Sequence, residues 1–157
     1  MKNLFLIVFI ALTQFAFSQA STEVSNNYDK IGKFVNGTAF VYKGGMVGLI
    51  DKDGKEIIKP EYEKISAFGE DGIAYTHKRG KVGMINKQGT VIVENIYDHI
   101  GHFSMGKAVV RKDGLCGVIN KTGKVIVDIK YDKLSMDNGV IKAVNPDGSQ
   151  VLVKTNE

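Results

Sequence analysis

The feature that most constrains the fold is an internal repeat with a period of about 34 to 35 residues. A tyrosine, an acid, a lysine or histidine and an aliphatic residue recur together at 28–31, 62–65, 97–100 and 131–134. A glycine followed by two aliphatic residues, Asp or Asn, and Lys recurs between them, within 47–52, 82–87 and 116–121. Such a period is typical of arrays of small supersecondary units, none of which buries its apolar face alone. The sequence therefore predicts repeat units near 28–61, 62–96 and 97–130 and a partial unit at 131–157.

Each unit has the pattern of a three-stranded antiparallel meander. In the second unit, 73–78, 82–85 and 91–93 are rich in β-forming residues and are separated by glycine-containing turns. Asp113-Gly114, in the third unit, is a strong signal for a two-residue hairpin. We therefore expect an all-β fold of tandem three-stranded meander repeats in an open twisted array. A closed propeller is the alternative, although its blades usually need four strands and more residues.

Alternation along the first strand of each meander predicts two different faces. Small residues, Ala39, Ala74 and Ala108, recur on one face and suit close packing against a neighbouring layer. The residues of the opposite face change from unit to unit. In repeat proteins constant columns build the core, while variable columns can form a contact surface. Aromatic and cationic side chains, which are enriched in binding hot spots, make this face the candidate binding surface: Phe40, Tyr42, Tyr75, His77 and Arg111.

The combined pattern of each unit resembles the WG-repeat family, also called KWG repeats. It reads Gly-x-Ala, then x-Gly-aliphatic-Ile-Asp/Asn-Lys-x-Gly, then aliphatic residues and Tyr-Asp/Glu. The copies are degenerate, because Val47, Val82 and Cys116 replace the family's tryptophan and the chain contains no Trp. The family is found in bacterial proteins, many of them exported. The resemblance implies a β-rich repeat module without established catalytic residues that serves interactions.

The N-terminus has the pattern of a secretory signal peptide. Lys2 precedes an apolar run at 4–12, and Ala16-Phe17-Ser18 offers small residues at a cleavage site. This predicts a signal peptide at 1–18, a polar tether at 19–27 and a repeat domain at 28–157. We expect export to the periplasm, the cell surface or the medium, with no membrane span after cleavage; an uncleaved anchor is the alternative.

Composition argues against nucleic acid as a partner. The formal net charge is +4, and basic residues are interleaved with acidic ones instead of forming a block. The expected partner is an unidentified protein or an envelope polymer.

Comparison between the copies argues against metal, cofactor and catalytic sites. Residues 51–54 resemble the start of a calcium loop, but the aligned segments of the other units have the composition of hairpin turns. His99 and His102 have the spacing of a metal pair, yet His99 occupies a column otherwise filled by lysine. The single cysteine, Cys116, occupies a column of buried valines. No metal, cofactor or catalytic residue is predicted.

The expected function is that of an exported, non-enzymatic β-repeat interaction module. Two alternatives stay open: a small hydrolase or metal-dependent enzyme, and a purely structural envelope protein.

Overall fold

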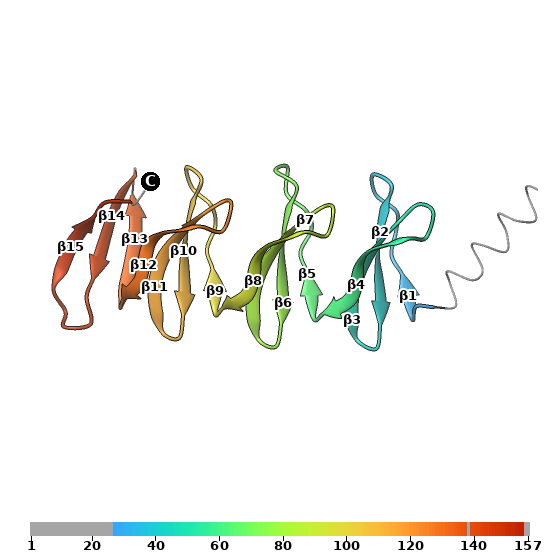
Figure 1. Cartoon of the computed structure of the whole chain (residues 1–157), viewed down its shortest axis with the longest axis horizontal. Coiled ribbons are helices and arrows are strands. Elements are labelled where there is room, and N and C mark those ends of the chain that lie inside the picture. Colours follow the sequence, from blue (N-terminus) through green and yellow to red (C-terminus); the bar gives the residue numbers. More distant parts are fainter. Residues whose placement is uncertain (1–26, 138, 156–157) are drawn as a thin grey trace, which may run out of the picture. The chain divides into compact units, whose positions relative to one another are not determined.

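The computed structural model describes residues 27–137 and 139–155, which form fifteen strands in four antiparallel sheets (Figure 1). The first sheet contains β1 (Lys30–Ile31), β2 (Thr38–Lys43), β3 (Met46–Asp51) and β4 (Glu56–Tyr62). The second contains β5 (Lys64–Ile65), β6 (Ile73–Lys78), β7 (Lys81–Asn86) and β8 (Val91–Tyr97). The third contains β9 (His99–Ile100), β10 (Lys107–Lys112), β11 (Leu115–Asn120) and β12 (Val125–Tyr131). The fourth contains β13 (Lys133–Asp137), β14 (Val140–Val144) and β15 (Gln150–Val153).

The sheets confirm the predicted all-β fold of tandem meanders. Strands pair in chain order within every sheet. The first three sheets each contain one element that the prediction lacks, a two-residue strand that begins two residues after the tyrosine. Each sheet formed by the described residues is open, and none closes into a barrel or ring.

The chain divides after Tyr62 into two compact units. The first unit contains the first sheet, whose core is formed by Ala39, Val41 and Ile50. The second unit contains the other three sheets, and its core lies between successive sheets. Met84 of β7 packs in one cluster with Val110 of β10, and Val118 of β11 packs with Ile141 of β14.

The predicted small-residue face is buried in all three full repeats. Ala39, Ala74 and Ala108 are at most 2% exposed. The central strands β3, β7 and β11 are buried on both faces along most of their length.

A glycine in each central strand permits a close approach of the following strand. The pairing of β3 with β4 shifts register around Gly48, and β7–β8 and β11–β12 shift at the equivalent glycines. A Cβ atom at Gly83 would lie 2.6 Å from the carbonyl oxygen of Val93, and one at Gly117 would lie 2.7 Å from that of Val127. These contacts are too short for any side chain, so the regular recurrence of this glycine along the chain has a packing cause.

The described residues contain no helix long and apolar enough to cross a membrane. The predicted signal peptide at 1–18 and most of the tether at 19–27 lie outside the described residues.

Candidate binding surface

The five predicted surface residues occupy equivalent positions on the second strand of each full sheet. Phe40 and Tyr42 lie on β2 in the first unit, whereas Tyr75 and His77 lie on β6 and Arg111 on β10 in the second unit. Tyr42 and Arg111 are exposed, and the other three are half-buried. The structure therefore places them on the face opposite the alanine core.

A second set of residues lies opposite Tyr42, His77 and Arg111, on the neighbouring two-residue strand of each full sheet. Tyr42 pairs with Lys30 of β1, and the Lys30 ammonium lies 5.5 Å from the centre of the Tyr42 ring. In the second unit, His77 pairs with Lys64. Arg111 of β10 pairs with His99 of β9. Each two-residue strand thus adds a cationic or imidazole side chain beside the variable residue.

Tyr75 connects its sheet with the next sheet of the second unit. Its hydroxyl donates a hydrogen bond to the carbonyl oxygen of Gly101, at 3.4 Å. Burial, followed by the nearby Asp71 carboxylate, raises the pKa of the Tyr75 phenol above its ordinary value. The residue therefore has a packing role within the second unit, whereas Arg111 remains available at the surface.

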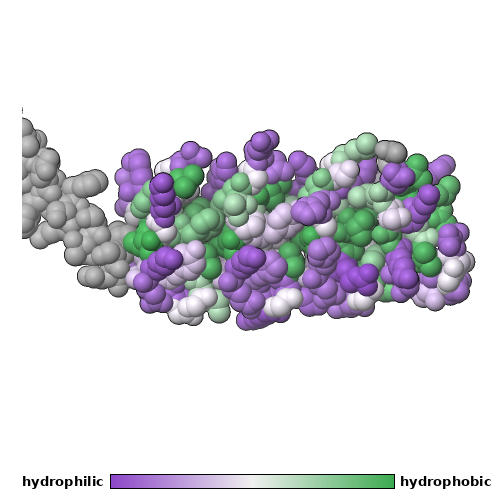
Figure 2. All heavy atoms as spheres, turned by 180° about the vertical axis from the view of Figure 1, so that it is seen from behind, coloured by the Kyte–Doolittle hydropathy of each residue, from purple (hydrophilic) through white to green (hydrophobic). Residues whose placement is uncertain are grey.

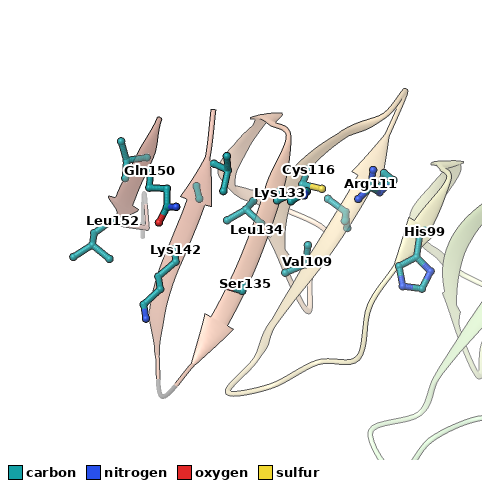
Figure 3. Close-up of a pocket in the computed structure, with 14 residues that line it drawn as sticks. His99, Val109, Arg111, Cys116, Lys133, Leu134, Ser135, Lys142, Gln150 and Leu152 are labelled. Atoms are coloured by element: carbon teal, nitrogen blue, oxygen red, sulfur yellow. The ribbon is translucent and has the colours of Figure 1, made fainter. Parts of the chain in front are cut away.

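An open groove of about 810 Å³ lies within the second unit, over the third and fourth sheets (Figure 3). Val109 and Arg111 line it from β10, and His99 lines it from β9. The fourth sheet contributes both polar and apolar side chains, among them Lys133, Ser135, Lys142, Val144, Gln150 and Leu152. The structure thus brings Arg111 together with residues of a different sheet.

The charged side chains that line the groove are all positive. Among the described residues that line it, Arg111, Lys133 and Lys142 are cationic and none is acidic. Within the described part of the chain, neither Lys133 nor Lys142 has an ion pair, whereas Lys81 and Lys121 pair with aspartates. Among the described residues, the Arg111 guanidinium donates to the Gly114 carbonyl oxygen, at 3.2 Å, through Nη1. Arg111, Lys133 and Lys142 therefore form no ion pair with a carboxylate of the described residues.

Of the groove residues, the sequence predicted only Arg111. His99 and Lys133 belong to the cationic column after each tyrosine, and that column alone resembles an ordinary solvated surface. This column lies opposite the variable one only because a separate two-residue strand after each tyrosine pairs with the first long strand of the next meander. Lys142 occupies the column of Phe40, Tyr75 and Val109, none of which is charged, so comparing copies gave no signal for it. Leu152 occupies the column of Leu49, Met84 and Val118.

The carboxylate that suggested calcium binding, and the acids that follow the tyrosines, are hydrogen-bonded to turns. The Asp51 carboxylate accepts the backbone N–H groups of Asp53 and Lys55, both at 2.9 Å. The Asn86 side chain makes the same pair of bonds in the second sheet. The acid after each of the first three tyrosines accepts a backbone N–H of the first hairpin turn. These acids are turn residues, as the repeat predicted.

The remaining histidines are dispersed, whereas the thiol candidate, Cys116, lines the groove together with His99. His99 lines the groove, while His77 and His102 do not. No group of three His, Cys, Asp or Glu side chains in the described residues is placed to hold a metal ion. Cys116 is buried opposite Tyr131, with its sulfur 3.7 Å from the carbonyl oxygen of Asp132.

Comparison with known proteins identifies the repeats. No curated protein matches the chain. A solved structure of a designed protein, "Crystal structure of the computationally designed Ika4 protein", matches 78% of this chain and 88% of its own, at 16% identity and a TM-score of 0.37. The model of the family described as "WG containing repeat" matches at 25–46, 48–81, 83–116 and 117–145, which is most of the chain. The chain therefore belongs to the WG-containing repeat family.

Proposed function

We propose that the protein is an exported, non-enzymatic interaction module that binds a protein or another envelope component. Its contact surface in the second unit is the groove over the third and fourth sheets. The observation that carries the proposal is that Arg111, Lys133 and Lys142 line one groove together with apolar side chains and with no described carboxylate. A concave surface with a few polar groups and an apolar lining is the usual form of a binding site.

The repeat architecture supports a binding role over catalysis. The acids after the first three tyrosines are hydrogen-bonded to turns. Among the described groove residues, the Cys116 thiol lies against the Asp132 carbonyl oxygen, and no hydrogen bond joins it or Ser135 to the His99 imidazole. Cationic side chains at a groove attract a complementary partner and speed its association.

Export and binding are tested separately. For export, a C-terminally tagged chain is expressed in a bacterial host and the cell fractions are compared. The proposal expects the product outside the cytoplasm, with Gln19 as its first residue by mass spectrometry. A full-length product retained in the cytoplasm would contradict export.

For binding, the chain without residues 1–18 is immobilised and exposed to solubilised envelope material. We expect one bound component, with hydrogen-exchange protection at the groove. Replacing Arg111, Lys133 and Lys142 together by Ala should abolish retention. Replacing Lys59, Lys87 and Lys124 by Ala removes the same charge elsewhere and should preserve it. Equal retention by both triple variants would exclude the groove as the contact surface.

A further inference from the structure

The outer strand of the fourth sheet is an unprotected edge. Within the described residues, β15 pairs only with β14. Natural edge strands are usually blunted by a bulge, a proline or a charge. The outer strands β4, β8 and β12 all contain register shifts, and β4 also contains Pro60. β15 is regular and carries neither a charge nor a proline over Gln150–Val153.

Hydrogen bonding in the hairpin determines which backbone groups face outward. The Asn145 N–H donates to the Ser149 carbonyl oxygen at 2.9 Å, which makes these two residues a bonded pair. Bonded pairs alternate along an antiparallel ladder, and β14 and β15 keep a regular register. The backbone N–H and C=O groups of Gln150 and Leu152 therefore point away from β14, toward the open edge.

The same edge exposes apolar surface. Leu152 is 73% exposed and Val151 is 37% exposed. In Figure 2, green hydrophobic atoms reach the part of the surface that the fourth sheet forms, with purple hydrophilic atoms around them. A strand with free backbone groups and exposed aliphatic side chains is a template for an added strand.

The charge beside the edge selects the kind of strand that fits. Lys142 pairs with Leu152 across the β14–β15 ladder, so an added strand would place a residue two strands from Lys142. Two strand spacings are about 10 Å, which a glutamate and a lysine side chain span together. Lys133 and Arg111 add positive potential over the rest of the groove. A second copy of this chain, with a net charge of +4 and the same cations, would be repelled.

We propose that the free edge of β15 binds an acidic peptide segment of a partner protein as an added β-strand, with the carboxylates of the peptide facing Lys142 and the groove. This inference rests on the proposed contact surface and names its ligand. Backbone pairing along Gln150 and Leu152 supplies the strand-like geometry, and the cations supply the preference for acidic side chains.

The test measures fluorescence anisotropy of a labelled peptide of alternating Glu and Val added to the chain without residues 1–18. The Lys–Val counterpart is the control peptide. We expect Leu152→Pro, which removes an outward N–H, to weaken binding about fivefold to tenfold relative to Leu152→Ala. Both variants lose the leucine side chain, and because the lost N–H bonds nothing in the sheet, both should keep similar melting temperatures.

Charge is tested with a matched pair of reversals. Lys142→Glu should weaken peptide binding about fivefold to tenfold. The control is Lys124→Glu, which lies in the turn before β12 and outside the groove. It should change peptide binding by less than about twofold. The Lys–Val peptide should bind weakly to the wild type and more tightly to Lys142→Glu.

Three outcomes would overturn the inference. The first is equal binding of the Glu–Val and Lys–Val peptides. The second is binding of polygalacturonate but not of the Glu–Val peptide, which assigns the groove to an anionic polysaccharide. The third is a concentration-dependent dimer that Leu152→Pro abolishes, which assigns the edge to a second copy. If envelope material still protects the groove in any of these cases, the interaction function stands and only the acidic-peptide inference fails.

Discussion

The Asp98 carboxylate accepts a hydrogen bond from the backbone N–H of Asp113, 15 residues away, at 2.7 Å. Asp113 has a φ of 52°, in the left-handed region, and begins a two-residue turn completed by Gly114. Asp29 holds Gly44 in the same way, and Glu63 holds Arg79. The acid after each of these tyrosines thus anchors the first hairpin turn of the same sheet, which gives the recurring Tyr-acid pair a structural cause.

The hydrogen bond between the Asp113 N–H and the Asp98 carboxylate predicts that replacing Asp98 changes how the stability of the fold depends on acid pH. The Lys81 ammonium, 2.5 Å from the carboxylate, and the Asp113 N–H lower the pKa of Asp98 below its ordinary value. A group with a lowered folded pKa stabilises the fold above its unfolded pKa, about 4, and loses this contribution as the pH falls through the folded value. Asp98→Asn should therefore lower the melting temperature at pH 7 and flatten its decline below about pH 4. Melting curves by circular dichroism between pH 2 and 7 check this, and parallel curves for wild type and variant would contradict it.

Gly83 predicts a large effect from a single methyl group. Its added Cβ would meet the Val93 carbonyl oxygen at 2.6 Å and the Asn95 backbone nitrogen at 3.0 Å, and neither backbone atom can move without breaking the β7–β8 ladder. Gly83→Ala should lower the free energy of unfolding by about 1–3 kcal/mol or more. Urea denaturation followed by tyrosine fluorescence measures the loss.

Gly80 provides the matched control for Gly83. Its φ is 70°, but nothing lies within 4 Å of an added Cβ. Asparagine tolerates the left-handed region, so Gly80→Asn should cost less than about 1 kcal/mol. Equal losses at the two positions would refute the close-approach explanation for the glycine of the central strand.

The repeat made most of the fold predictable, because each turn glycine and each small-residue position could be checked against its copies. The two-residue strand Lys64–Ile65 could not be predicted, since two residues carry no alternation signal. Gly83 was visible in the sequence, but the pattern does not reveal which backbone approaches it. The groove depends on how the third and fourth sheets pack, so only the three-dimensional structure shows that Lys142 and Arg111 line the same groove.

Tyr28 predicts an alkaline transition in the first unit. Its hydroxyl donates to the Glu56 carboxylate at 2.9 Å, and burial, followed by this bond, raises the pKa of Tyr28 to about 12. A group with a raised folded pKa contributes stability that is complete below its unfolded pKa, about 10, and is lost as the pH rises through the folded value. An ultraviolet titration should show a tyrosine ionisation near pH 12 that Tyr28→Phe removes. Glu56→Gln should move that ionisation to lower pH; an unchanged late transition in both variants would assign it to another tyrosine.

Thr76 and Asn95 form a polar pair where the other repeats have apolar ones. Thr76 is fully buried, and the Asn95 amide donates to its hydroxyl at 3.0 Å and to its carbonyl oxygen at 3.0 Å. The equivalent positions are Val41 with Pro60 in the first sheet and Val110 with Ile129 in the third. The pair therefore changes together along the chain, as expected if the two side chains meet across the central glycine.

This pairing predicts a non-additive mutant cycle. Asn95→Ile leaves the Thr76 hydroxyl buried without its amide partner and should cost about 1–3 kcal/mol of unfolding free energy. Adding Thr76→Val recreates the Val–Ile pair of the third sheet and should recover most of the loss, because replacing both partners of a buried hydrogen bond by apolar groups is nearly neutral. Urea denaturation of the wild type, both single variants and the double variant gives the coupling energy. Additive effects would show that the two side chains stabilise the second sheet independently.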